Sequence, residues 1–263
     1  MSLLRAVTSE LRKTATLPAS LGAIGVAVAG SVGITLLNAS YARAALGGDP
    51  RFDGFETSPA ETAFAAVPLG VVGAVILGVV AISSEYTANS SDAGGGRQIT
   101  ATLTATPRRL TLLAAKAVAV VVLIAITAAV TIAACIALAH LVIGTAVTPD
   151  DTGETIARAL GAGLYCALMG LLALAITVLI RSGIMPLIVL IANSSLVSVS
   201  FLLSQVTPLA RFLPDLAGIR LFARESFAAF DDALDPLTGG LVMAAWAFGL
   251  LAVSAVVFTR RDA

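Results

Sequence analysis

Charged residues are scarce in this chain. They make up 12% of its 263 residues, about half of the roughly 25% typical of a soluble domain. Hydrophobic residues account for 58%, and the mean hydropathy is +0.97. Such a chain could bury a large core but could not cover it with a polar surface, so we expect lipid to be its solvent. Acidic and basic residues balance and no basic cluster occurs, so a nucleic-acid partner is not expected.

Residues that could carry chemistry are also few. His140 is the single histidine, which excludes zinc motifs built on paired histidines. Neither lysine, Lys13 or Lys116, follows a glycine, so the Gly-Lys pair of a phosphate-binding loop is missing. Cys135 and Cys166 lie in apolar runs, a placement typical of buried side chains rather than of a disulfide or a metal pair. We therefore expect no enzyme activity from this chain by itself, and no cofactor or metal within it.

Six apolar runs reach the about 20 residues that a helix needs to cross the hydrocarbon of a bilayer. They cover about 17–37, 62–82, 111–143, 156–180, 184–204 and 237–258. This number predicts one all-α membrane domain over residues 1–263, with both termini on the same side. The fourth and fifth runs are separated only by residues 181–183, which predicts a tight helical hairpin. A cleaved signal peptide ending near residues 42–44 is the alternative for the first run, but that run is longer than a usual signal core.

The charges of the connecting segments predict the orientation. Ten basic and four acidic residues fall on the side that holds the N-terminus, residues 83–110 with Lys116, Arg181 and the C-terminus. Six basic and twelve acidic residues fall on the other side. Because cytoplasmic loops carry an excess of lysine and arginine, the first side is predicted to be the cytoplasm. The Ala-rich, Lys-poor composition, with two lysines against fourteen arginines, is typical of a GC-rich bacterial genome, so the expected location is a bacterial plasma membrane.

Two amphipathic segments are expected outside the spans. Residues 1–16 place Leu3, Leu4, Val7 and Leu11 on one helical face, which predicts a helix lying in the cytoplasmic interface. Between the last two spans, residues 205–236 repeat apolar side chains at helical spacing and carry several prolines. This spacing predicts one or two amphipathic helices that rest on the outer face or dip into it.

Small and neutral polar residues are the remaining features inside the spans. Two stripes of small residues would let helices approach closely, either in a dimer or within the monomer; they are Gly25, Ala29 and Gly33 in the first span and Gly70, Ala74 and Gly78 in the second. The fifth span carries too many polar residues for a lipid-facing helix. A translocation path and ordinary interhelical hydrogen bonding both explain this set, which comprises Asn193, Ser194, Ser198, Ser200 and Ser204. No acidic residue lies in the centre of any span, which argues against a proton-coupled carrier.

The largest cytoplasmic segment, residues 83–110, has the features of a docking element. After Gly94-Gly95-Gly96, residues 97–105 can form a short helix with Ile99 and Leu103 on one side. Pro107 fits the first turn of the next helix, and Arg108, Arg109 and Lys116 are expected to stay in the interfacial water. A short helix parallel to the membrane could dock into a groove of a cytoplasmic partner.

The chain resembles the permease subunits of type 2 ABC exporters, especially those of actinobacteria. The similar stretches follow the family's order along nearly the whole chain: RAVTSELRK at 5–13, Glu85-Tyr86, ATLTATPRR at 101–109, Lys116, LIRS at 179–182, FLPDLAG at 212–218 and RRDA at 260–263. One departure is TANSSDAGGG at 87–96, which separates the Glu-aromatic pair from the helix that follows.

This resemblance implies a homodimer of permeases in which each copy sits on a separate ATPase subunit that binds ATP and Mg. ATP-driven closure of the two ATPases would pass through the cytoplasmic loop to the spans, and residues 205–236 would form a lid on the exit. The residues implied in coupling are Glu85, Ile99, Leu103, Pro107, Arg108 and Arg109, although arginines here also fit simple anchoring by positive charge. The expected cargo is amphipathic or lipid-like. A secondary carrier and a non-transporting scaffold are the alternatives.

Overall fold

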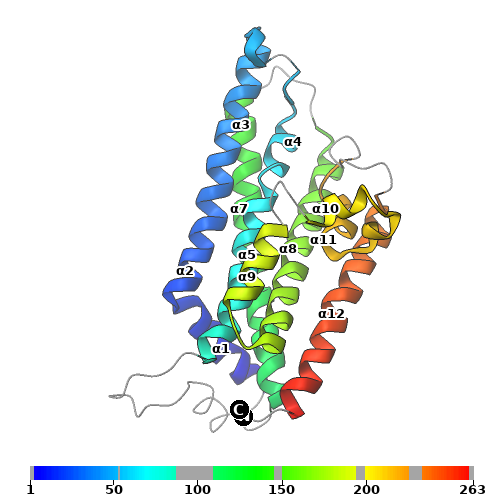
Figure 1. Cartoon of the computed structure of the whole chain (residues 1–263). Coiled ribbons are helices and arrows are strands. Elements are labelled where there is room, and N and C mark those ends of the chain that lie inside the picture. Colours follow the sequence, from blue (N-terminus) through cyan, green and yellow to red (C-terminus); the bar gives the residue numbers. More distant parts are fainter. Residues whose placement is uncertain are drawn as a thin grey trace.

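The computed structural model describes residues 3–52, 54–86, 109–144, 150–193, 199–224 and 233–260. Within these ranges every regular element is a helix. The long helices stand side by side in one elongated bundle (Figure 1). Helix α1 (Leu3–Thr16) and the end of α12 (Pro236–Arg260) lie at the same end of this bundle. The end that holds α1 and the last turn of α12 is called the lower end, and the opposite end is called the upper end, as in Figure 1.

Five stretches of helix are long and apolar enough to cross a membrane. They are Pro18–Leu46, Pro59–Tyr86, Arg109–Ile143, Thr152–Ile180 and Pro236–Arg260. These stretches contain five of the six predicted spans, so the prediction of an all-α, multi-pass membrane protein is confirmed at this level. The fifth predicted span, 184–204, contains two shorter helices, α9 (Ile184–Asn193) and α10 (Val199–Ser204). Because α9 has only 10 residues, a sixth span stays a prediction, as does the side of the membrane on which the ends lie.

The first span runs without interruption through three elements. It begins with α2 (Pro18–Gly25), continues through one π-helical turn, η1 (Val26–Gly30), and ends with α3 (Ser31–Leu46). Pro18 lies in the first turn, where its missing N–H is not needed. The helix extends nine residues beyond the predicted end at 37, because its upper turns bury Ala39 and Ala42 completely against neighbouring helices.

The second span contains two helices, α4 (Pro59–Phe64) and α5 (Val67–Ser83), followed by the turn η3 (Ser84–Tyr86). The Ser58 side chain caps α4 by accepting a hydrogen bond from the Glu61 backbone. The third span, α7 (Arg109–Ile143), has 35 residues, so it is about 52 Å long and exceeds the roughly 30 Å of hydrocarbon, as the long third run predicts.

The fourth span, α8 (Thr152–Ile180), has defined ends. The Asp151 side chain accepts hydrogen bonds from the Gly153 and Glu154 backbones at its start, and Arg181 ends it with a left-handed φ of 58°. Only residues 181–183 separate α8 from α9, so the predicted tight hairpin is confirmed. At Gly183 an added Cβ would lie 2.9 Å from the Ser83 Cβ, which places the hairpin directly against the lower end of α5.

Helices α5 and α8 form the centre of the bundle, and their backbones meet at two glycines. A Cβ at Gly78 would overlap the carbonyl oxygen of Gly170 and lie 3.1 Å from the Ala173 Cβ. The large buried side chains around this contact come from α5, α7, α8 and α12, and include Leu77, Ile124, Met169, Leu172 and Met243. Small residues at such a crossing let two helices pack backbone to backbone in lipid.

We expect Gly78→Ala to lower the free energy of unfolding by about 1–3 kcal/mol, because the added methyl group must push α5 away from α8. The matched control is Gly249→Ala in α12, since a Cβ at Gly249 would meet no atom within 4 Å. The control is expected to unfold like the wild type or slightly later, because alanine favours helix more than glycine does. Thermal unfolding in detergent measures both variants, and equal loss in the two would contradict the expected contact at Gly78.

The segment before α12 folds back onto the upper end of the bundle as three short helices. They are η5 (Pro208–Phe212), α11 (Pro214–Ala217) and η6 (Ile219–Leu221), and residues 225–232 lie outside the described ranges. A Cβ at Gly161 of α8 would overlap the Leu221 carbonyl, and one at Gly239 of α12 would overlap the Ala217 carbonyl. The described part thus rests on the bundle as predicted, but as single turns rather than as one or two longer amphipathic helices, since Pro208 and Pro214 each begin a new turn.

Candidate functional site

Helix α1 lies across the lower end of the bundle and turns a polar face toward it. Its buried residues are Ala6, Glu10 and Thr14, one turn apart, and Leu3 and Leu4 are exposed. A helix is present over the predicted segment, at Leu3–Thr16, whereas its place in a cytoplasmic interface stays a prediction. The face of α1 that packs against the bundle carries the Glu10 carboxylate, and Leu3 and Leu4 point away from it. A helix held only by lipid would not bury a carboxylate in this way. Pro18 starts α2 directly after α1, which allows the chain to bend there.

Glu10 reaches a buried ion-pair cluster that joins three helices. The Lys116 Nζ of α7 lies 2.7 Å from Glu10 Oε2 of α1 and 2.7 Å from Glu85 Oε1 of η3. Lys13 Nζ donates to the same Glu85 oxygen. The side chains of Lys116, Glu10 and Glu85 are 4%, 8% and 2% exposed, and that of Lys13 is 24% exposed. We call these four residues the lower cluster.

The lower cluster corrects one expectation. Lys116 is predicted to stay in the interfacial water, but it is buried and paired with two carboxylates. The chain thus holds buried charge near the ends of its spans, although the sequence places no acidic residue at their centres. These groups do not lie at the centres of the spans. Lys116 is the eighth residue of α7, and α7 is longer than the membrane is thick, so Lys116 lies near one end of the span. One feature of the sequence does indicate the cluster. A lysine within an apolar helix needs an acidic partner, and Glu10 and Glu85 lie on the same predicted side of the membrane.

Of the six residues implied in coupling, the structure describes Glu85 and Arg109. The Arg109 Nη1 donates to the Phe258 carbonyl at 3.1 Å, which joins the start of α7 to the end of α12. Beside Glu85, the Arg181 guanidinium lies 5.9 Å from the centre of the Tyr86 ring. Both described members therefore lie at the lower end of the bundle. The other four lie outside the described residues: Ile99, Leu103, Pro107 and Arg108.

A second buried cluster lies at the upper end and joins α4, α8 and the segment after η6. Arg158 binds Glu61 with both terminal nitrogens, at 2.5 Å and 2.9 Å. Its Nε donates to the Phe222 carbonyl at 2.7 Å, and the guanidinium lies 4.4 Å from the centre of the Phe64 ring. The Arg158 and Glu61 side chains are 10% and 8% exposed.

Two more residues complete this upper cluster. Arg224 Nε lies 3.1 Å from Glu61 Oε1 and 2.8 Å from Glu154 Oε1. The hydrogen bond to Glu154 raises the pKa of the Arg224 guanidinium above its ordinary value. Arg224 and Glu154 are 40% and 42% exposed, so they form the exposed edge of the network, and Arg158 and Glu61 form its buried part. The sequence gives no local sign of this cluster, because Glu61 and Arg158 are 97 residues apart.

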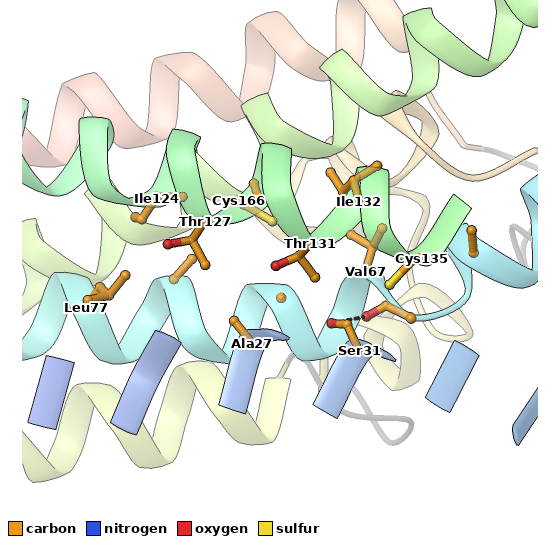
Figure 2. Close-up of a pocket in the computed structure, with 15 residues that line it drawn as sticks. Ala27, Ser31, Val67, Leu77, Ile124, Thr127, Thr131, Ile132, Cys135 and Cys166 are labelled. Carbon is orange, nitrogen blue, oxygen red and sulfur yellow. Dashed lines mark hydrogen bonds between the residues drawn. The ribbon is translucent and has the colours of Figure 1, made fainter. Parts of the chain in front are cut away.

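A small cavity lies between the first span, α5 and α7, near the middle of the bundle (Figure 2). Its volume is about 30 Å³, which is room for one or two water molecules. The lining is mostly apolar, with Thr127, Thr131 and Cys135 from α7 and Ser31 from α3. Ser31 donates to the Ala66 carbonyl at 3.2 Å, whereas the buried Thr131 hydroxyl has no hydrogen-bond partner among the described residues. At this size the cavity is too small to hold an amphipathic cargo.

The two stripes of small residues have different surroundings. In the second span, Ala74 and Gly78 are buried, and a Cβ added at Gly70 would lie 3.9 Å from the Cys166 Sγ of α8. This stripe therefore packs within the monomer. In the first span, Gly25, Ala29 and Gly33 are all exposed. A Cβ at either of these glycines would meet nothing within 4 Å. The first stripe therefore faces away from the bundle.

The polar residues of the predicted fifth span are described in part. Asn193 Oδ1 accepts hydrogen bonds from the backbone and the hydroxyl of Ser200, both at 3.1 Å. Ser204 donates to the Phe201 carbonyl at 2.7 Å. Ser194 and Ser198 lie outside the described residues. The described members thus find partners within their own segment, and a translocation path along them stays a prediction.

Comparison with protein-family models and with curated proteins gives no match for this chain. The two buried clusters and the exposed stripe are therefore the features on which a function can be argued.

Proposed function

We propose that this chain is the transmembrane permease subunit of an ATP-driven ABC exporter, which moves an amphipathic or lipid-like substrate outward across a bacterial plasma membrane. A separate ATPase subunit would bind ATP and Mg and hydrolyse the ATP. The observation that carries the proposal is the lower cluster, because Glu85 at the start of the 83–110 loop binds Lys116, which lies shortly after the end of that loop, at 2.7 Å.

This contact gives the loop a mechanical connection to the spans. Glu85 ends the second span and Lys116 lies near the start of the third, so a force on the loop acts on α5 and α7 through the same ion pair. Glu10 and Lys13 bring α1 into the same contact. Separating the members of a buried network leaves charges without solvent, so α1, η3 and α7 are expected to move together.

The proposed assembly contains two permeases, two ATPases and surrounding lipid, and no nucleic acid. The exposed stripe of Gly25, Ala29 and Gly33 supports a second copy of the permease, because small residues let helices of two chains approach closely.

Purification of the chain from its native host, in a mild neutral detergent, tests the assembly. The expected result is a complex with two permeases and two copies of an ATPase that carries a phosphate-binding loop. Absence of any such ATPase, both in the purified complex and among the neighbouring genes, would overturn the proposal.

Coupling through the loop has its own test in the purified complex. We expect Leu103→Ala combined with Arg108→Ala to lower transport-coupled ATP hydrolysis at least fivefold while the complex still assembles, since coupling between two sites is typically about 5–150-fold. The matched control is Arg12→Ala, which removes an exposed basic residue of α1 and leaves the loop intact. If the control loses as much as the double variant, the loop arginines act only as positive anchors. Unchanged hydrolysis in the double variant would exclude this loop from coupling.

The buried charges also support a second candidate, a carrier driven by an ion gradient. Glu85 and Glu61 are buried acidic groups, which are typical of proton and cation pathways. Both lie at the ends of the bundle and not at its middle, where carriers bind their ions, and this placement favours the exporter. Transport into vesicles separates the two: a carrier stops when an ionophore removes the gradient, and an exporter stops when ATP is withdrawn.

A further inference from the structure

The upper end of the bundle holds a second cavity, much larger than the central one. Its volume is about 710 Å³, which is within the range of sites for small organic ligands. The first turns of α8 form one wall, η6 and the residues after it form another, and Pro236 at the start of α12 contributes to the rim. The described lining includes Arg158, Arg220 and Arg224 against one acidic residue, Glu154. The rest is apolar or small, with Ala157, Gly161, Leu221 and Ala223.

Arg224 is the residue best placed to bind a ligand there. Both of its ion pairs use Nε, which binds Glu61 Oε1 and Glu154 Oε1. In the part of the chain that the structure describes, its two terminal nitrogens make no hydrogen bond. The side chain is 40% exposed, so these nitrogens can be reached from the cavity. Two carboxylates thus fix the guanidinium by one edge and leave its other donors for a planar, anionic partner.

The geometry points to a binding site for a phosphate or carboxylate group in this cavity, with Arg224 as the anion-binding residue. The apolar side chains Leu221 and Ala157 beside it fit the alkyl part of an amphipathic anion, such as an anionic lipid. Arg158 serves as a positioning residue, because it holds Glu61 with both terminal nitrogens and so keeps Glu61 in place for Arg224. Nothing in this site requires ATP or a partner subunit, so it stands or fails independently of the proposed transport function.

The test is a binding measurement on the purified full-length chain in a neutral detergent with native mass spectrometry as the readout. Dodecyl phosphate is the probe, and inorganic phosphate is the comparison without an alkyl chain. We expect one dodecyl phosphate to bind each chain and Arg224→Gln to weaken binding about tenfold or more, as loss of a charge-assisted hydrogen bond predicts. Arg224→Lys keeps the positive charge but lacks the paired donors, so its affinity for dodecyl phosphate is expected to lie between those of the wild type and Arg224→Gln.

The matched control is Arg51→Gln. Arg51 is an exposed arginine at the same end of the bundle, paired with Asp49 and absent from the described lining of the cavity. This variant is expected to bind like the wild type. A second variant, Ala157→Glu, adds a repelling charge at an exposed lining position and removes no native contact. It is also expected to weaken binding about tenfold, which keeps the test valid if Arg224→Gln folds poorly.

Two results would overturn the site. One is unchanged binding in Ala157→Glu and in the folded Arg224 variants, and the other is an equal loss in Arg51→Gln. Equal affinity for inorganic phosphate and dodecyl phosphate would overturn the proposal of an amphipathic ligand and would show that the site binds a free anion. Much tighter binding of dodecyl phosphate confirms the amphipathic ligand.

Discussion

Lys116→Ala is expected to lower the free energy of unfolding by about 3–5 kcal/mol, the loss typical when one partner of a buried ion pair is removed. The substitution leaves Glu10 and Glu85 facing the vacated position, with side chains only 8% and 2% exposed. Lys13 is then the one described cation in contact with them, and it binds only Glu85. The two carboxylates repel each other and have little water to stabilise their charge.

A thiol-reactive dye measures this loss, because Cys135 and Cys166 are both free and buried and react only when the bundle opens. Lys13→Ala is the control within the same cluster. Its side chain lies at the exposed edge, and Lys116 still binds both carboxylates, so we expect a loss of about 1 kcal/mol or less. Lys116→Met combined with Glu10→Gln and Glu85→Gln should regain most of the stability, because no buried charge then lacks a partner. A Lys116→Ala variant as stable as the wild type would show that water reaches the cluster.

Composition and periodicity predict the helical part of this fold well. Spans need about 20 apolar residues whatever their neighbours are, so a single sequence is sufficient to find them. The extensions were not predictable in the same way. The first span continues to Leu46 because Ala39 and Ala42 find neighbours on other helices, and polar residues such as Asn38 and Ser40 conceal this continuation in the sequence.

The two stripes of small residues show a second limit. Gly25-x-x-x-Ala29-x-x-x-Gly33 and Gly70-x-x-x-Ala74-x-x-x-Gly78 have the same spacing. One is exposed and the other is buried against α8. The difference depends on where each helix stands, since α5 lies in the centre and the first span lies at an edge of the bundle (Figure 1). A stripe of this kind predicts a close helix contact but not which helix supplies the partner.

The charged clusters were missed for a related reason. Most members lie near the end of a span, where a charge next to water needs no explanation, and Arg224 lies in the segment between two spans. Only the folded chain brings Glu61 and Arg158 together across 97 residues and Lys116 and Glu10 across 106. Of the residues implied in coupling, Glu85 acquires a described structural role, as an acceptor for two lysines. The positions between 87 and 108 stay predictions.

Arg158→Leu is the second substitution expected to have a large effect, lowering the free energy of unfolding by about 3–5 kcal/mol. Arg158 makes two hydrogen bonds to Glu61 and one to the Phe222 carbonyl, so its loss frees three acceptors. Arg224 then remains as a partner of Glu61, but through a single nitrogen at 3.1 Å. The connection between α4, α8 and the segment after η6 is weakened at the same time.

Arg158→Lys separates charge from geometry. A lysine keeps the positive charge beside Glu61 but cannot bind both carboxylate oxygens and the Phe222 carbonyl together, so we expect a loss of about 1–3 kcal/mol. Arg51→Leu is the control, because its 79% exposed side chain pairs with the nearby Asp49 at the surface, and we expect no measurable change. A double-mutant cycle between Arg158→Leu and Glu61→Gln isolates the pair, and coupling above about 1 kcal/mol is expected for residues in direct contact. A cycle with no coupling would mean that Arg224 alone neutralises Glu61, and that Arg158 acts through its contacts with Phe64 and Phe222.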